Sequence, residues 1–190
     1  MRAKDFKMQA KAALKGNWGK FALIFFIYSA ILGGVSATGV GSIATLVVAG
    51  PFALSLAIVS LKVIRAEGIA VGDLFEGFKN FVPAFVLGLL NSIFIGLWSL
   101  LLFVPGIIKT YAYSMSTYIL ADNPEMNQGE ARRASIEMMK GHKWELFCLH
   151  FSFIGWYLLS CLTLGILFFW VNPLVQTATA AFYENLKNNN

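Results

Sequence analysis

Long apolar runs alternate with short polar segments along the chain, and this pattern predicts helices rather than strands. A run of about 20 apolar residues is long enough to cross the ~30 Å hydrocarbon layer of a membrane as an α-helix. Six apolar runs occur, at about residues 18–37, 41–61, 81–95, 96–120, 144–164 and 165–183, and the third of them is short. The sequence therefore predicts an all-α fold, with residues 1–190 forming one polytopic membrane domain of six transmembrane helices.

Residues 1–16 have the pattern of a basic amphipathic helix. Lysines recur at three- and four-residue steps, and apolar side chains do the same on the opposite face. The basic positions are Lys4, Lys7, Lys11 and Lys15, and the apolar ones are Ala3, Phe6, Ala10, Ala13 and Leu14. Such a helix is expected to lie on the membrane, with its cations on anionic headgroups and its apolar face among the acyl chains. A nucleic-acid-binding arm is the rival interpretation, and the membrane spans that follow disfavour it.

Two further surface helices are predicted, at about residues 70–79 and 127–140. The first has apolar residues at helical spacing within a polar connector. The second begins at Asn127 with Glu130 three residues later, which resembles a capping box. We expect both helices to lie at the cytoplasmic interface.

The chain also suggests a threefold internal repeat of helical hairpins. In each unit a glycine ends the surface helix, a second glycine makes the outer turn, and a proline follows inside the returning span. The ending glycines are Gly16, Gly77 and Gly141, the turn glycines Gly41, Gly96 and Gly165, and the prolines Pro51, Pro105 and Pro173. Kinks at one depth would expose backbone carbonyls that must face protein, water or a ligand. The alternative is that these prolines only bend helices to fit a bundle.

Composition and charge placement support a membrane protein. Hydrophobic residues make up 57% of the chain and charged residues 13%, against about 25% charged residues in soluble domains. The net charge is +5, and every basic residue except Lys109 lies in residues 1–20, 62–79, 122–145 or 184–190. Because cytoplasmic segments are enriched in Lys and Arg, we expect both termini to be cytoplasmic.

No catalytic motif stands out, so we expect neither an enzyme nor a bound metal or cofactor. His142 and Glu145 lie one helical turn apart, but Cys148 and His150 point to different faces of a helix and are poorly placed as metal ligands. We expect His150 to hydrogen-bond a neighbouring helix instead.

Lys109 is the residue with the strongest functional signal. If the outer turn lies at Gly96, Lys109 lies about 20 Å down the returning helix, inside the hydrocarbon layer, where it would offer a counter-charge to an anionic ligand. If the turn lies at Pro105 and Gly106, Lys109 extends to the outer interface instead. The first arrangement preserves the repeat and is preferred. The candidate ligand-binding set is Lys109, Pro105, Gly106, Asn91, Asn172 and Gln176.

Several short motifs resemble the bacterial membrane family called domain of unknown function 975. They are Pro105-Gly106-Ile107-Ile108, Tyr113-Ser114-Met115, residues 119–124, Ala134-Ser135, Met139-Lys140-Gly141, residues 152–156, and Pro173 followed by Phe182-Tyr183. The resemblance implies a multi-pass protein of the bacterial plasma (inner) membrane with no established activity. The chain is more distantly similar to membrane domains attached to some glycerophosphodiester phosphodiesterases, from which no catalytic residue can be transferred.

Three hypotheses for function follow. The preferred one is a non-enzymatic module that binds or passes lipids or other amphiphiles through an interior of kinked helices. The second is a scaffold or regulatory subunit that uses the amphipathic helices and a protein partner. The third is protection against membrane-active peptides, which no particular residue supports.

Overall fold

Every regular element that the structure describes is helical. The computed structural model describes residues 3–37, 41–101, 103–163 and 165–189. The elements are α1 (Ala3–Leu14), α2 (Trp18–Ala37), α3 (Gly41–Ile64), the 3₁₀ helix η1 (Val71–Phe78), α4 (Phe81–Leu101), α5 (Phe103–Tyr113), α6 (Ser116–Asp122), α7 (Gln128–Met138), α8 (Lys143–Phe151), α9 (Ile154–Leu162) and α10 (Phe168–Asn189). The predicted all-α class is confirmed.

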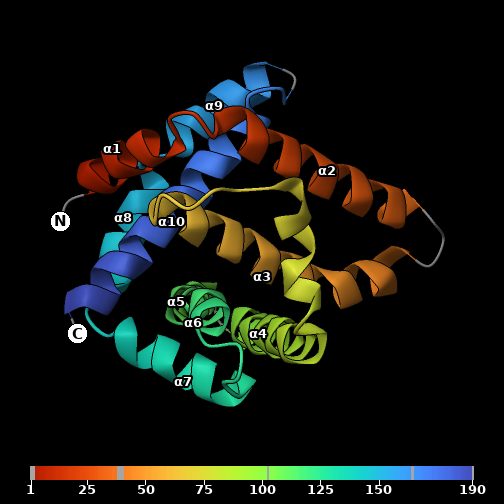
Figure 1. Ribbon diagram of the computed structural model, residues 1–190. Helices are drawn as coiled ribbons and strands as arrows, with labels where there is room; N and C mark the ends of the chain where they lie inside the picture. The colour runs from red at the N-terminus through yellow and green to blue at the C-terminus, as the bar shows by residue number, and fades with distance from the viewer. Residues whose placement is uncertain (1–2, 38–40, 102, 164, 190) are drawn as a thin grey trace.

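Helices α3 and α10 form the centre of the fold. They pack against each other; α3 also contacts α1, α2, η1, α4 and α6, and α10 also contacts α1, α2, α8 and α9. In Figure 1, α2 and α3 run across the view while α4 and α5 are seen nearly end-on. The helical hairpins therefore do not share one axis, as they would in a simple parallel bundle.

Three helical segments in the described part of the chain are long and apolar enough to cross a membrane. They cover Val47–Ile64, Phe81–Ser99 and Lys143–Leu162, and Trp18–Gly34 is a shorter apolar helix. The six predicted spans are not confirmed. In the second hairpin, two turn residues, Ser114 and Met115, separate the short helices α5 and α6.

The second hairpin corrects the prediction at Gly96. Helix α4 continues through Gly96 to Leu101, and α5 begins at Phe103. A glycine inside an apolar helix weakens it by only about 1 kcal/mol and need not end it. Pro105 is the third residue of α5, and a proline in the first turn removes no helical hydrogen bond. Pro105 therefore lies at the start of this helix and does not kink it.

The three hairpins differ from one another, and the threefold repeat is not confirmed. Pro51 and Pro173 do lie inside α3 and α10. The return of the second hairpin is divided into α5 and α6, and the outward part of the third is divided into α8 and α9. Gly165 does form the third turn: its backbone is left-handed, with φ of +85°, a conformation that glycine adopts without strain.

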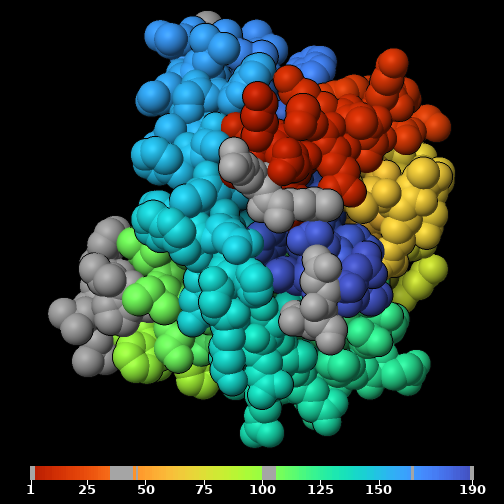
Figure 2. All heavy atoms as spheres, turned by 90° about the vertical axis from the view of Figure 1, so that its left-hand side faces the viewer, coloured from red at the N-terminus to blue at the C-terminus, as the bar shows by residue number. Residues whose placement is uncertain are grey.

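The apolar face of α1 is buried in protein, which corrects the prediction that it enters the acyl region. Phe6, Ala10 and Leu14 are at most 2% exposed, and the Phe6 ring lies 5.3 Å from that of Phe182 on α10. Figure 2 shows the side of the molecule where α1 lies against α10 and beside α8 and α9. Amphipathicity marks a face that must leave water, but it does not show whether lipid or protein covers that face.

A lysine of α1 also contacts the junction between α8 and α9. Lys7 Nζ donates a hydrogen bond to the backbone carbonyl of Ser152 and lies 4.2 Å from the centre of the Phe153 ring. The carbonyls at the end of a helix have no partner within that helix. Lys7 satisfies one of them, so this cation has a structural partner in addition to any headgroup.

The two predicted interfacial helices have different outcomes. Residues 71–78 form a 3₁₀ helix with Leu74 and Gly77 buried and with Val71 and Phe75 exposed, so a helix with one exposed face is present, but it is not an α-helix. Helix α7 forms as expected: the side chain of Asn127 accepts a hydrogen bond from the Gly129 amide at 3.0 Å. Ser135 on α7 donates to the Ala112 carbonyl of α5 at 2.8 Å, which docks α7 onto the second hairpin.

Element η1 is held against α3 by a close approach at the proline of α3. Ser55 Oγ donates to the Pro51 carbonyl and accepts from the Gly77 amide, both at 3.0 Å. A Cβ atom on Gly77 would overlap the Pro51 carbonyl oxygen and the Ser55 side chain. Gly77 therefore serves close packing, whereas the sequence pattern assigned it to the end of a helix.

We predict that Gly77→Ala destabilises the protein by about 1–3 kcal/mol, because the methyl group forces η1 away from the α3 backbone. Thermal unfolding of the purified protein in detergent measures the effect as a lower Tm. Gly72→Ala is the matched control, since a Cβ at Gly72 of the same element meets nothing within 4 Å. Equal Tm values for the two variants would contradict the packing role.

Candidate functional site

A cavity lies among the central helices and combines apolar walls with a few polar groups. Its volume is about 330 Å³. The lining residues are Tyr28, Ala53, Leu56, Ala57, Ser114, Thr117, Tyr118, His150, Val175, Gln176 and Thr179. They come from α2, α3, α6, α8 and α10 and from the turn between α5 and α6. Segments far apart in the sequence therefore build this site together.

The polar groups of the cavity are tied to one another across helices. Tyr118 on α6 donates to Gln176 Oε1 on α10 at 3.1 Å. His150 Nε2 lies 3.2 Å from Thr179 Oγ1, and Thr179 Oγ1 donates its own proton to the Val175 carbonyl at 2.9 Å. The hydroxyl must therefore accept from His150, so Nε2 carries the proton and Nδ1 of the neutral ring is a hydrogen-bond acceptor. The expected hydrogen bond from His150 to a neighbouring helix is confirmed.

A second cavity of about 330 Å³ adjoins the first. Its lining consists of Ile107, Thr110, Tyr111, Ser114, Phe147 and His150. Ser114 and His150 belong to both linings. The second cavity is the more apolar and aromatic of the two, and the two cavities are neighbours that share part of their walls.

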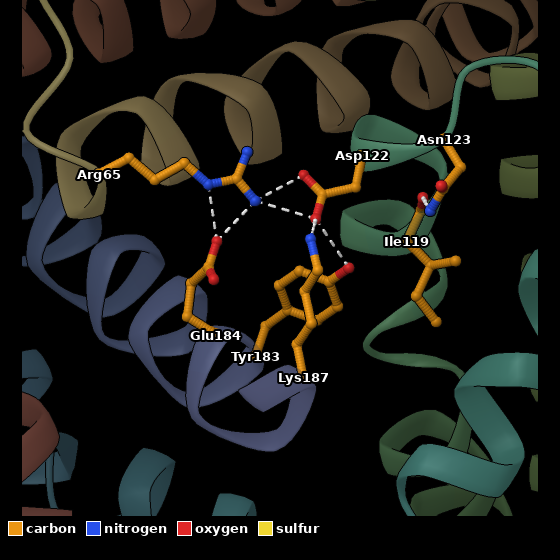
Figure 3. Close-up of polar contacts among 7 residues, drawn as sticks. All are labelled: Arg65, Ile119, Asp122, Asn123, Tyr183, Glu184 and Lys187. Atoms are coloured by element: carbon orange, nitrogen blue, oxygen red, sulfur yellow. Dashed lines mark hydrogen bonds and ion pairs between the residues drawn. The ribbon is translucent and has the colours of Figure 1, made fainter. Parts of the chain in front are cut away.

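An ion cluster joins three helices beyond the cavity, as Figure 3 shows. Asp122 is the last residue of α6, and its side chain is 6% exposed. Arg65, just after α3, binds both Asp122 oxygens at 2.7 and 2.9 Å. From α10, Lys187 Nζ lies 2.6 Å and the Tyr183 hydroxyl 3.0 Å from Asp122 Oδ2. Arg65 also binds Glu184 of α10 at 2.7 Å.

Two stacked tyrosines connect this cluster to the cavity. The rings of Tyr118 and Tyr183 lie 5.7 Å apart at an interplanar angle of 24°. Tyr118 lines the cavity. Tyr183 donates a hydrogen bond to Asp122, which lies one helical turn after Tyr118 on α6. The cluster therefore fixes the end of the helices that carry the polar groups of the cavity.

The electrostatics of Asp122 favour its ionised form. Burial alone would raise the pKa of this carboxyl, but hydrogen bonds from Lys187 and Arg65, together with their charges, outweigh burial and lower the pKa below its ordinary value. The carboxylate thus has one charged partner just after α3 and another on α10.

Of the predicted ligand-binding residues whose side chains the structure describes, only Gln176 lines the cavity. Asn91 donates to Ser116 Oγ at 3.0 Å. Asn172 donates to the Phe168 carbonyl of its own helix at 3.0 Å, and its Oδ1 lies 3.5 Å from the Tyr157 hydroxyl. These amides tie helices together and do not form one cluster.

Lys109, Pro105 and Gly106 lie near the tip of the second hairpin. Lys109 is six residues after the start of α5, or about 9 Å along the helix, which corrects the predicted depth of about 20 Å. Its Nζ lies 5.1 Å from the centre of the Trp98 ring. Gly106 packs closely on Ser99 of α4, and the side chain of Pro105 lies outside the described residues.

The comparisons with known proteins give a family. The model of the family described as "Protein of unknown function (DUF975)" matches residues 1–109 and 100–190. The chain belongs to this family. No curated protein and no solved structure matches the chain, and the fainter similarity to glycerophosphodiester phosphodiesterase membrane domains is not shown by these comparisons.

Sequence reasoning found Gln176 and His150 in this DUF975 protein but missed most of the site. Tyr118, Thr179 and the partners of Asp122 come from different helices, and their spacing in the sequence carries no sign of contact. One available signal was the run of polar residues Gln176, Thr177 and Thr179 within α10, because polar groups in an otherwise apolar helix need partners. Among the described residues no three His, Cys, Asp or Glu side chains are grouped for a metal.

We predict that Asp122→Asn lowers the free energy of unfolding by about 1–3 kcal/mol near neutral pH, because the ion pairs with Arg65 and Lys187 are lost and solvent screens part of their value. The pKa of Asp122 is lowered in the folded state, so its contribution is complete above the ordinary aspartate value of 3.8 and disappears as the pH falls below it.

Denaturant titrations of the wild type and Asp122→Asn at several pH values measure this difference. The gap between the two proteins should be constant near neutral pH and close in acid. Glu125→Gln is the control, since Glu125 is exposed and lies three residues away. A gap that does not change with pH would contradict a stabilising role for the Asp122 charge.

Proposed function

We propose that this protein is a non-enzymatic membrane protein that binds a lipid or another amphiphile in the paired cavities around His150. One observation carries the proposal: two adjoining cavities of about 330 Å³ each share Ser114 and His150. Ligand sites are concave and mostly apolar, with a few polar groups that orient the ligand.

The distribution of polar groups matches a molecule with two unlike ends. Tyr118, Gln176 and Thr179 line the first cavity, where they offer hydrogen bonds without a net charge. Ile107 and Phe147 line the second cavity, where they suit a hydrocarbon chain. The predicted counter-charge of Lys109 is not part of either lining, so the proposed headgroup is held by hydrogen bonds and not by an ion pair.

The proposal includes a location in the bacterial plasma membrane with both termini cytoplasmic. The placement of nearly all basic residues near the termini and in the two polar connectors supports this orientation. Lys4 and Lys11 on α1 and Lys15 just after it are exposed, which leaves them available for anionic headgroups although the apolar face of the helix is buried.

The scaffold hypothesis is weaker because the amphipathic helices are already used within the chain. The apolar face of α1 packs on α10, and Ala131 and Ser135 of α7 are buried against the second hairpin. A partner that needed these faces would have to displace them. Nothing in the geometry favours protection against membrane-active peptides.

Ser114→Phe tests the proposal, since a bulky ring at Ser114 occupies space in both cavities. We expect purified Ser114→Phe to retain about tenfold less co-purifying amphiphile than the wild type. The lost apolar contacts and headgroup hydrogen bonds together reduce the binding free energy by more than ~1.4 kcal/mol, which corresponds to a tenfold lower affinity. Native mass spectrometry after gentle release from the membrane measures the bound species.

Ser29→Phe provides the control. Ser29 bonds the Phe25 carbonyl of its own helix, as Ser114 bonds the Tyr111 carbonyl, but Ser29 belongs to neither lining. Equal retention in the Ser114 and Ser29 variants, with both folded by circular dichroism, would overturn the proposal.

A further inference from the structure

An arginine on α7 has its cation directed at aromatic rings instead of at an acid. The guanidinium carbon of Arg132 lies 4.3 Å from the centre of the Phe94 ring on α4 and 5.9 Å from that of Tyr113 on α5. The two rings form an edge-to-face pair with centroids 6.5 Å apart. Stacking on aromatic rings fixes the plane of a guanidinium without using its hydrogen-bond donors.

The donors of Arg132 are incompletely satisfied. Its Nη1 atom is buried and has no hydrogen-bond partner among the described residues. A buried unpaired donor on a charged group is costly, and such groups normally hold an anion or an acceptor. Neither α4 nor α5, the helices that carry the two rings, contains an acidic residue. No acidic side chain of these two helices therefore pairs with Nη1, which leaves the donor open to an acceptor from a bound molecule.

A second unsatisfied group lies on the same helices. Asn91, one turn before Phe94 on α4, donates to Ser116 Oγ, and Ser116 Oγ donates to the Tyr113 carbonyl at 2.6 Å. These bonds use the amide nitrogen of Asn91, whereas its Oδ1 is buried without a partner. This acceptor suits a water molecule or a hydroxyl group beside an anion.

Large apolar side chains next to Phe94 on α4 are exposed. Ile93 and Leu97, which flank Phe94 on α4, are 48% and 53% exposed, and they belong to a segment apolar enough to cross a membrane. An anionic group on Arg132 would thus lie next to a surface that suits an acyl chain.

We propose that Arg132, held by Phe94 and Tyr113, binds a phosphate group, most favourably that of an anionic phospholipid whose acyl chain lies along Ile93 and Leu97. The planar guanidinium offers paired donors that match phosphate oxygens. This site is separate from the cavities around His150 and contains none of their lining residues. The inference goes beyond the proposed function, because the Arg132 site selects a charged headgroup, whereas the cavities hold a headgroup by hydrogen bonds alone.

The test uses the full chain in bilayers of phosphatidylcholine that contain phosphatidylglycerol. Native mass spectrometry counts the phosphatidylglycerol retained after gentle release. We expect the wild type to hold one tightly bound phosphatidylglycerol and Arg132→Gln to hold about tenfold less, as the loss of a charge-assisted hydrogen-bond pair predicts. Arg133→Gln, at the exposed neighbouring arginine, should retain the lipid as the wild type does.

Two further arms separate the sources of phosphate and guard against misfolding. Arg132→Met keeps a long side chain over the Phe94 ring but removes every donor, so it replaces Arg132→Gln if that variant does not fold. Excess inorganic phosphate that displaces the lipid from the wild type would show that free phosphate uses the same site, and failure to displace it would show that the lipid is required.

Retention of phosphatidylglycerol by Arg132→Gln or Arg132→Met at the level of Arg133→Gln would overturn the proposal. Ser114→Phe should not change this lipid, because Ser114 lies in the other site. Loss in the Ser114 variant but not in the Arg132 variants would assign the anionic lipid to the cavities instead.

Discussion

The fold depends on the carboxylate of Asp122 and the cations that neutralise it. A buried carboxylate is costly by itself, and removal of one partner from a buried ion pair leaves an uncompensated charge. Arg65 follows α3, Asp122 ends α6, and Lys187 belongs to α10, so the pairing is complete only when the ends of three helices meet at one point. The hydrogen bond from the Tyr183 hydroxyl to Asp122 and the pairing of Arg65 with Glu184 are directional, which nonspecific apolar packing is not. Because the cavity lies one helical turn away, its polar groups take their positions from this meeting point.

Small residues allow α4 and η1 to approach α3 closely. A Cβ on Gly50 would overlap the Ala84 carbonyl of α4, and Gly88 lies against Gly50. In a membrane, where apolar side chains gain little by leaving lipid for protein, close backbone contact and hydrogen bonds are what bring helices together. The contacts of Gly50 with α4 and of Ser55 with η1 occur on either side of Pro51. A single helix thus receives partners from several directions, which agrees with hairpins that do not share an axis.

The sequence predicted those features that depend on neighbouring residues. The helical class, the cap at Asn127 and the turn at Gly165 each follow from a local pattern, and each is present. Features that depend on distant residues were not predicted. Gly96 looks like a turn in sequence, yet α4 passes through it, because nothing at that position competes with the helix. The apolar face of α1 gave no sign that α10 would cover it. Arg65 and Asp122 are 57 residues apart, and each alone is an ordinary charged residue at the end of an apolar run.

The polar groups near the apolar core fall into three classes, which differ in whether the chain itself supplies their hydrogen-bond partners. Serine and threonine hydroxyls mostly return to the carbonyl four residues earlier, as Ser60 and Thr177 do, so they need no other partner. Asn172 does the same with its amide. Nη1 of Arg132 and Oδ1 of Asn91 have no such partner, although the rings around Arg132 hold it in place. The cavity groups form a third class, because Tyr118 and His150 are paired but line open space. A neutral headgroup would compete for hydrogen bonds in the cavity, whereas an anion at Arg132 would complete an unfilled set, so the two sites would select lipids of different charge.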